Sequence, residues 1–354
     1  HDDRRLRAHR EHAVILLRRL LYSLLPALTR LGRWLPASMH PGVRATRALA
    51  DLGIDMGVDS DTLSHRVFAS YWRSHLLLRH SFETPLPKIE EYLDCNVQES
   101  GAVDMDHIAA MHGGVILATP HYGAFITACL FAIRKLHGRK RFNVIFNDPA
   151  ITPSNKVYEP LFRRLGCDVT VLYPDRRGTL SALKALKRGE CLAILPDVYL
   201  ANDATIAVPF FGRLLRVMAG TAFFASRTGA PIFPVYGIPG SGMKIDLLFD
   251  QPLVIEGLVD SDDKQTLFNI TAALAERMER QLRAAPEHWH YWETLGERST
   301  ALGVFRSREE LLALADRRIR STPSLARDLP GLLHSWTHLF PSPPERVNRH
   351  IHLE

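Results

Sequence analysis

The sequence is poor in cysteine, the residue on which disulfide frameworks and most zinc sites depend. Its 354 residues include four cysteines, none in a CxxC pair: Cys95, Cys129, Cys167 and Cys191. Scattered cysteines, most of them in apolar stretches, are typical of buried thiols in a reducing compartment. We therefore expect neither a disulfide framework nor a zinc site. No cysteine or acid spacing supports His288 and His290 as ligands, so no other metal site is predicted.

An uninterrupted apolar run and a phosphate-binding loop are also missing. A transmembrane helix needs about 20 consecutive apolar residues, whereas arginines and Pro26 interrupt the leucine-rich stretch 12–35. Its leucines recur at helical spacing, so we expect a basic amphipathic helix that lies in a membrane interface, or else an ordinary helix packed on the core. Gly113-Gly114 lack the pattern of a phosphate loop, and no cofactor is expected.

The chain carries a modest excess of positive charge, +6 at neutral pH, and its basic residues gather near the N-terminus. This distribution suits an anionic membrane surface or a polyanionic partner, and it does not distinguish between them. We expect a membrane surface or a lipid as partner and no DNA, and we leave RNA open.

The middle of the chain alternates between strand-like and helix-like segments, the pattern of an α/β layer fold. Strands are expected at 115–119, 142–146, 168–172, 191–195, 232–235 and 244–249. Helices are expected at 123–136, 155–165, 179–187, 219–228 and 264–283. The predicted fold class is α/β, a central, mostly parallel or mixed sheet flanked by helices, with amphipathic helices at the N-terminus.

This pattern divides the chain into three regions. We expect residues 1–105 to form a helical, membrane-associating region, with its second helix at 61–82. Residues 106–300 would form the α/β catalytic domain. Residues 301–354 would form a C-terminal extension with one helix, at 308–320, and a proline-rich end.

One histidine lies where an α/β sheet usually carries its reactive groups. His121 follows the apolar run 115–119 directly after Pro120, and reactive groups in such sheets collect at the carboxyl ends of strands. A histidine there can take a proton from a hydroxyl or amine as that group attacks a carbonyl. His121 is therefore the candidate general base, and a packed structural histidine is the alternative.

A carboxylate and an amide follow two further predicted strands. Asp197 closes the apolar run 191–194, and a carboxylate near an imidazole base would fix its tautomer and stabilise the imidazolium. The alternative is an aspartate that caps a loop. Asn147 follows the strand at 142–146 and, together with Thr221, is a candidate substrate contact.

Aromatic and basic side chains gather in the segment between these strands and the helix at 219–228. Arg213 and Arg216 would clamp a phosphate or carboxylate of the donor or acceptor, or lie in solvent. Phe210 and Phe211 would line a groove for an acyl chain, or belong to the core.

In this order, the segments resemble the lysophospholipid and lipid A acyltransferase superfamily, in particular the lauroyl and myristoyl transferases of late lipid A assembly. The resemblance covers roughly residues 13–292. The matching segments are His121-Tyr122-Gly123, Leu195-Pro196-Asp197, Val208-Pro209-Phe210-Phe211-Gly212, Thr228-Gly229-Ala230-Pro231-Ile232-Phe233-Pro234 and the aromatic stretch from Pro286 to Trp292.

The resemblance implies an activity, partners and a location. Such an enzyme moves an acyl group from an acyl carrier protein or coenzyme A thioester to a hydroxyl or amine of a lipid A-like acceptor. His121 would be the base and Asp197 its orienting partner, with Tyr122 and Gly123 beside the substrate. The implied location is the cytoplasm, peripheral at the inner face of a bacterial membrane.

The chain departs from the family pattern at one position. The family has an acid five residues after the histidine, where this sequence has Ile126. Because an apolar side chain cannot orient an imidazole, either Asp197 alone holds the ring or the chemistry has changed. The alternatives are a natural-product acyl or aminoacyl transferase that acts on a nitrogen nucleophile, and a non-catalytic lipid-binding homologue.

Overall fold

We analysed a computed structural model of the chain, which describes residues 13, 14, 16, 17, 20–24, 35–165, 168–199 and 205–301. The predicted helix at 308–320 lies outside these residues, as does Cys167.

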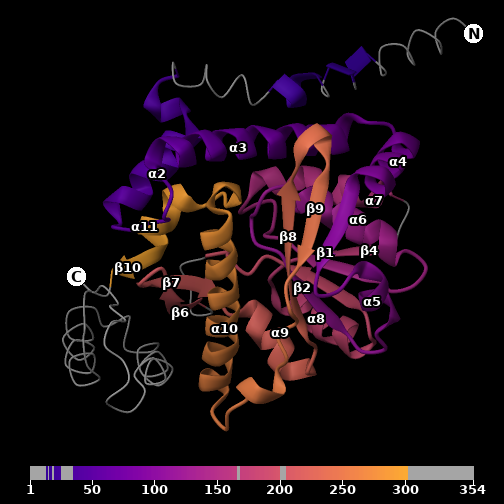
Figure 1. Ribbon diagram of the computed structural model, residues 1–354. Helices are drawn as coiled ribbons and strands as arrows, with labels where there is room; N and C mark the ends of the chain where they lie inside the picture. Colours follow the sequence, from indigo (N-terminus) through magenta and orange to yellow (C-terminus); the bar gives the residue numbers. More distant parts are fainter. Residues whose placement is uncertain are drawn as a thin grey trace, which may run out of the picture.

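A seven-stranded sheet forms the centre of the molecule, in the order β1-β9-β8-β2-β5-β3-β4 (Figure 1). Its strands are β1 (Val97–Gly101), β2 (Val115–Ala118), β3 (Phe142–Ile145), β4 (Val169–Leu172), β5 (Cys191–Ile194), β8 (Ile232–Pro239) and β9 (Ile245–Phe249). Only β8 and β9 pair antiparallel, so β1 and β9 run opposite to the other five strands. The predicted class, a mostly parallel α/β sheet, is confirmed.

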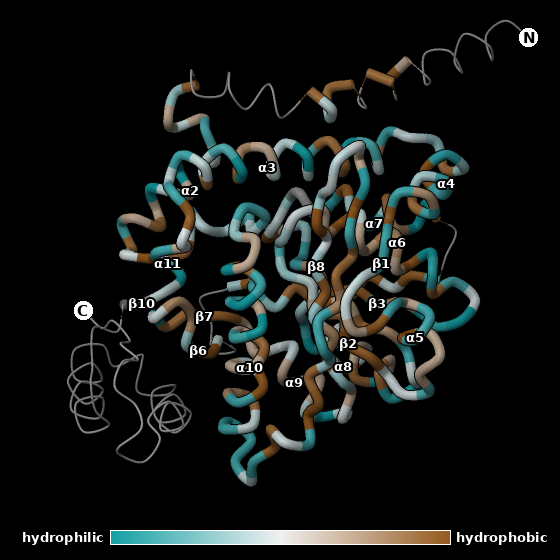
Figure 2. Tube along the Cα trace, viewed as in Figure 1, coloured by the Kyte–Doolittle hydropathy of each residue, from teal (hydrophilic) through white to brown (hydrophobic). Residues whose placement is uncertain are grey.

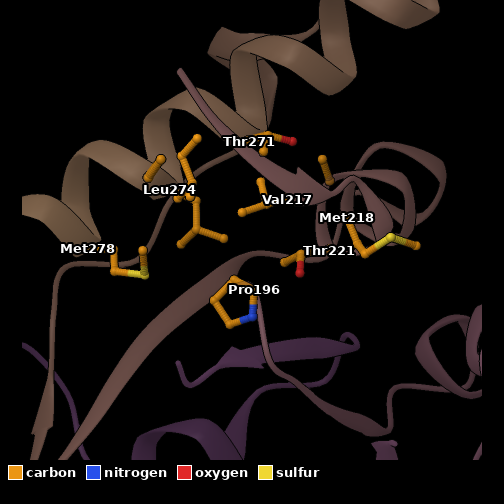
Figure 3. A pocket seen from close by; sticks show the side chains of 10 residues that line it. Pro196, Val217, Met218, Thr221, Thr271, Leu274 and Met278 are labelled. Atoms are coloured by element: carbon orange, nitrogen blue, oxygen red, sulfur yellow. The ribbon is translucent and has the colours of Figure 1, made fainter. Parts of the chain in front are cut away.

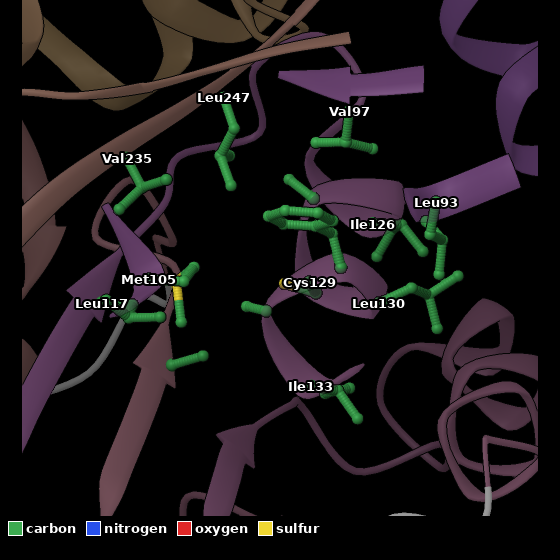
Figure 4. Close-up of a cluster of buried hydrophobic side chains, with 14 of the residues drawn as sticks. Leu93, Val97, Met105, Leu117, Ile126, Cys129, Leu130, Ile133, Val235 and Leu247 are labelled. Atoms are coloured by element: carbon green, nitrogen blue, oxygen red, sulfur yellow. The ribbon is translucent and has the colours of Figure 1, made fainter. Parts of the chain in front are cut away.

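Helices cover both faces of this sheet. They are α3 (Ser60–Glu83), α4 (Leu86–Asn96), α5 (Met105–Ala110), α6 (Phe125–Leu136), α7 (Tyr158–Arg163), α8 (Arg176–Lys187), α9 (Gly220–Thr228) and α10 (Asp263–Ala284). Val115 and Leu117 of β2 pack towards α4, α5 and α6 (Figure 4), whereas Ile116 and Ala118 pack towards α8, α9 and α10. Strands that are covered on both faces have continuous apolar sequences. This explains why β2 and β5 could be predicted from the sequence.

A smaller antiparallel sheet lies at one side of α10. It consists of β6 (Thr205–Phe210), β7 (Arg213–Met218) and β10 (Ser299–Ala301). A separate apolar cluster joins it to α10, α3 and α2 (Pro41–Asp51). This sheet, β1, α2, α4, α5 and the short α11 (Leu295–Arg298) were not predicted from the sequence.

The described N-terminal residues 13, 14, 16, 17 and 20–24 are helical, as predicted. Tyr22 is buried and its hydroxyl donates to the main-chain oxygen of Gly240 at 2.7 Å, while Arg73 of α3 lies over its ring. The neighbouring apolar side chains are exposed instead, and they colour this segment brown in Figure 2: Val14, Leu16, Leu17, Leu20, Leu21 and Leu24. Within the described parts of the chain, no helix has the length and apolarity to cross a membrane.

Candidate active site

The structure brings His121 and Asp197 together at the carboxyl ends of two neighbouring strands. Ala118 of β2 pairs with Ile194 of β5, so the histidine and the aspartate each lie three residues beyond paired positions. His121 Nδ1 is 2.9 Å from Asp197 Oδ1, and the His121 main-chain N–H donates to Oδ2 at 2.9 Å. The parallel register thus places the imidazole against the carboxylate.

The Asp197 carboxylate is fully buried, yet it is held in its charged form. Burial by itself raises the pKa of the Asp197 carboxyl. The neighbouring His121 and hydrogen bonds from His121 and from the indole of Trp289 outweigh that effect and hold the pKa below its usual value. An ionised carboxylate only accepts hydrogen bonds, which assigns the ring proton of His121 to Nδ1.

Aromatic side chains surround the His121 imidazole. Its side chain is 19% exposed, and the rings of Tyr291 and Phe125 lie 4.5 and 5.1 Å from it, centre to centre. With Nδ1 bound to the carboxylate, Nε2 is the ring nitrogen that can accept a proton. The contact with Asp197 therefore directs Nε2 away from the carboxylate, and the ring has the partial access that a general base needs.

The turn after the histidine requires glycine. Gly123 has φ of +54°, and a Cβ there would lie 2.1 Å from the main-chain oxygen of Gly237. Its N–H donates to the main-chain oxygen of His288, and the next N–H, of Ala124, donates to Gly237. The glycine thus ties the end of β2 to β8 and to the C-terminal aromatic segment, which fixes the position of His121.

Three of the predicted substrate contacts are core side chains in this structure. The Tyr122 hydroxyl donates to the main-chain oxygen of Ala285 and accepts from Gln281. Phe210 and Phe211 are buried and pack edge-on against Trp289 and Trp292. Phe210 and Phe211 therefore pack beneath Trp289 and Trp292 and do not contact the His121 imidazole.

The predicted polar contacts lie at different places around the site. Asn147 follows β3, the neighbour of β5 in the sheet, and its Nδ2 lies 3.4 Å from Thr152 Oγ1. Arg213 Nε donates to Ser299 Oγ of β10 at 2.8 Å. Arg216 donates to the main-chain oxygen of Glu297, and its guanidinium lies 5.1 Å from the ring centre of Tyr199, just past Asp197.

Thr221 lies in an apolar cavity between β7, α9 and α10 (Figure 3). Its Oγ1 is buried and has no hydrogen-bond partner. Pro196, the residue before Asp197 in the chain, forms one wall of the cavity. The other lining residues are Leu215, Val217, Met218, Ala222, Thr271, Leu274, Ala275 and Met278.

Position 126 carries no polar function in this structure. Ile126 belongs to α6 and is 4% exposed. Its side chain lies with Leu93 of α4 and Leu130 in the apolar cluster of Figure 4. The aspartate from β5 is therefore the acid that contacts His121 here.

Sequence reasoning missed the side chains that the C-terminal segment contributes. Trp289 Nε1 donates to Asp197 Oδ2 at 2.9 Å, Tyr291 packs on His121, and Arg298 donates to the Asp197 main-chain oxygen at 3.0 Å. The aromatic stretch around Trp289 was noticed only as part of a family resemblance. Trp289 lies 92 residues after Asp197 in the chain, and no local sequence pattern predicts a contact between residues so far apart.

The fold is that of an α/β protein, and the buried histidine–aspartate pair at the strand ends is its candidate active site. Residues 23–295, well over half of the chain, match the model of the bacterial lipid A biosynthesis acyltransferase family. The chain therefore belongs to this family and is an acyltransferase. It is also similar to a phosphatidylinositol mannoside acyltransferase of Mycolicibacterium smegmatis, with 27% identity over 241 residues, 63% of this chain and 67% of that protein.

Proposed function

We propose that the protein transfers an acyl group from an acyl carrier protein or coenzyme A thioester to a hydroxyl of a lipid-like acceptor, with His121 as general base. The observation that carries this proposal is the 2.9 Å contact between His121 Nδ1 and the buried Asp197 carboxylate. That contact leaves Nε2 as the proton acceptor on an aromatic-lined imidazole.

In the proposed reaction the acceptor hydroxyl gives its proton to His121 Nε2 as its oxygen attacks the thioester carbonyl. The Asp197 carboxylate stabilises the imidazolium that forms, because the negative carboxylate and the positive ring are in direct contact in a buried setting. The carbon–sulfur bond then breaks, an ester forms, and the imidazolium returns its proton to the departing thiolate. An amine acceptor would follow the same steps and yield an amide.

We further propose that the acyl chain of the donor enters at the apolar cavity of Figure 3, which has room for a water-sized group in this structure and would have to widen to take the chain. Pro196 connects this cavity to Asp197, and nearly all of its lining is aliphatic or thioether. Long acyl chains bind in concave apolar sites with few polar groups. Met218 and Met278 at its walls are flexible side chains that adapt to irregular shapes.

The acceptor lipid is proposed to arrive from a membrane surface at the N-terminal helix. Leu16, Leu17 and Leu20 each expose about half of their side chains, while Tyr22 fixes the helix to the β8–β9 hairpin. A helix with an exposed apolar face inserts shallowly into the lipid interface. The membrane region 1–105 and the peripheral location predicted from the sequence are retained as proposals on this basis.

The test is transfer of a radiolabelled acyl group by purified wild-type protein and the His121→Ala variant. Saturated acyl-CoAs and acyl carrier protein thioesters serve as donors, and a mannosylated glycolipid, a lipid A precursor and a long-chain amine serve as acceptors. General-base catalysis is worth about 10²- to 10⁴-fold, so His121→Ala should lose at least about 100-fold in kcat.

The control is His107→Ala, which removes an exposed histidine of α5, the helix that precedes β2 in the chain. Both variants should keep the melting temperature of the wild type within a few degrees. Near-normal turnover by a folded His121→Ala protein would refute the assigned base. Transfer to the amine alone would favour the nitrogen-acylating alternative, and no transfer by the wild type would favour a lipid-binding homologue.

A further inference from the structure

The segment from Pro286 to Trp292 crosses the carboxyl ends of β2 and β5 and places an indole on the site carboxylate. Trp289 is 2% exposed, and its Nε1–H donates to Asp197 Oδ2 at 2.9 Å. The segment is anchored to the turn after β2, since the His290 N–H donates to the His121 main-chain oxygen and Gly123 donates to His288.

The hydrogen bonds of Asp197 determine which way its carboxylate faces. Oδ2 accepts from two directions, from the His121 main-chain N–H and from the Trp289 indole, each at 2.9 Å. With Oδ2 held at two points, rotation about the Cβ–Cγ bond is blocked, and Oδ1 must face Nδ1 of the imidazole. The indole therefore constrains the carboxylate and does not touch the imidazole nitrogens.

We propose that Trp289 is a positioning residue for catalysis, the third member of an indole–carboxylate–imidazole triad that orients His121 through Asp197. This inference rests on the proposed function, since it concerns how the proposed base is held. It explains how a chain with Ile126 in place of the family acid keeps an oriented imidazole.

The acid that orients His121 lies in an irregular turn, which needs external support. Asp197 lies three residues beyond the last residue of β5, in a turn that belongs to no helix or strand. Arg298 donates to its main-chain oxygen, so the C-terminal segment holds both the backbone and the side chain of this residue. A reactive group must be held by neighbours whose own conformations are fixed by packing.

Packing fixes the indole itself. Trp289 contacts Trp292 and Phe210 edge-on, with ring centres 4.7 and 5.8 Å away. Both neighbours are buried. A large planar side chain in such contacts has few accessible rotamers, so its N–H direction is defined by the core of the small sheet.

The chain offers a matched control for a test of this triad. Trp292 is 1% exposed, belongs to the same segment, and donates its Nε1–H to the main-chain oxygen of Pro286 at 2.7 Å. Trp292→Phe and Trp289→Phe therefore remove the same group and one buried hydrogen bond each. Only Trp289→Phe removes a bond to the Asp197 carboxylate.

We expect Trp289→Phe to lower kcat by about 10- to 100-fold with KM within about twofold of the wild type, because small misplacements of a reacting group can cost about 10²-fold. Trp292→Phe keeps an aromatic ring against Trp289 and leaves the bond from Trp289 to Asp197 in place, so it should lose clearly less kcat than Trp289→Phe once corrected for its folded fraction. Trp289→His, which keeps a ring N–H, should recover part of the loss. In an Asp197→Asn background Trp289→Phe should cost little more, since the indole acts through the carboxylate.

The pH profile gives a readout that a purely structural role would not move. Without the indole N–H the pKa of Asp197 rises, so the acidic limb of kcat should move to higher pH in Trp289→Phe and stay in place in Trp292→Phe. If the phenylalanine variant does not fold, ¹⁵N-indole spectra decide. Asp197→Asn should then shift the Nε1–H resonance of Trp289 and leave that of Trp292 unchanged.

The outcomes separate this inference from the proposed function. If His121→Ala is inactive and Trp289→Phe is as active as Trp292→Phe, the triad is wrong and the base assignment stands. Equal losses in the two tryptophan variants, or an unshifted Trp289 resonance in Asp197→Asn, would also overturn the triad. Full activity of His121→Ala would instead overturn the proposed function.

Discussion

Replacing Ile126 by glutamate tests whether this enzyme has moved its orienting acid or merely lost it. Position 126 is where the family carries an acid, but here the side chain lies among Leu93, Leu130 and other residues between α6 and α4 (Figure 4). Phe125, one residue earlier, is the side chain of α6 that meets the His121 ring. A glutamate at 126 would therefore start from the apolar side of the helix.

Two costs set the expected loss of stability. Giving up the burial of the isoleucine side chain costs about 2 kcal/mol. A glutamate buried in this setting stays protonated. Because pH 7 is about 2.7 units above the ordinary pKa of a glutamate, keeping the proton bound costs about 4 kcal/mol, at about 1.4 kcal/mol per unit. The sum, about 6 kcal/mol, is comparable to the whole unfolding free energy of many domains.

Ile126→Gln is the control, because it has nearly the same shape as glutamate and no charge at any pH. The free energy of unfolding of both variants should be measured by urea denaturation at pH 5 and pH 8. The cost of keeping the glutamate neutral is about 1 kcal/mol at pH 5 and about 5 kcal/mol at pH 8. The free energies of unfolding of the two variants should therefore differ by about 1 kcal/mol at pH 5 and by about 5 kcal/mol at pH 8.

Acyl transfer should not rise in either variant, since the carboxylate cannot reach His121 from this face. A glutamate variant with the melting temperature of the wild type and a clear gain of activity would refute the reasoning. It would show that the α6 terminus still accommodates the family acid, and that Asp197 is only a partial substitute.

Three further changes test the site and its surroundings. Asp197→Asn should lower kcat by about 100-fold or more, by analogy with orienting acids elsewhere, whereas a change in KM alone would make Asp197 a substrate contact. Ala275→Leu narrows the cavity of Figure 3 and should shift donor preference in acyl-CoA competition assays towards shorter chains, with an unchanged profile counting against the acyl site. Burial lowers the pKa of His290 to about 3 and of His288 to about 4. The unfolded chain then binds more protons below about pH 6.5, so the free energy of unfolding should fall by a few kcal/mol as the pH drops towards 4. His290→Phe should flatten that slope in urea titrations, and an unaltered slope would contradict its burial in neutral form.

The strands that could be predicted are those that carry a strong local signal. The runs 115–118 and 191–194 are continuous apolar segments, because helices cover both faces of the sheet there. β1 lies at the edge of the large sheet, and β6 and β7 belong to the small sheet. Buried and partly exposed residues are mixed along all three strands, so their sequences carry a weaker pattern. Their pairing partners lie far away in the chain, and local periodicity does not encode distant pairing.

The site divides in the same way. His121 and Asp197 each follow an apolar strand, and the tendency of α/β sheets to gather reactive groups at strand ends predicted that the two side chains would meet. Phe210 and Phe211 belong to the core, because the short β6–β7 hairpin turns them towards Trp289 and Trp292. That orientation depends on the register of a sheet that the sequence did not reveal.

The contacts that Trp289 and Arg298 make with Asp197 can be understood from the position of that acid, in the turn after β5. An acid on α6 would be carried by a helix that directly follows the histidine, and the two groups would need no third element. An acid after β5 reaches the histidine across the sheet from an irregular turn, and its buried charge requires donors from outside that turn. Trp289 and the His121 main-chain N–H donate to the carboxylate, and Arg298 donates to the main-chain oxygen of Asp197. An apolar residue at 126 and polar contacts from a segment more than 150 residues later in the chain are therefore what an acid supplied from the turn after β5 would require.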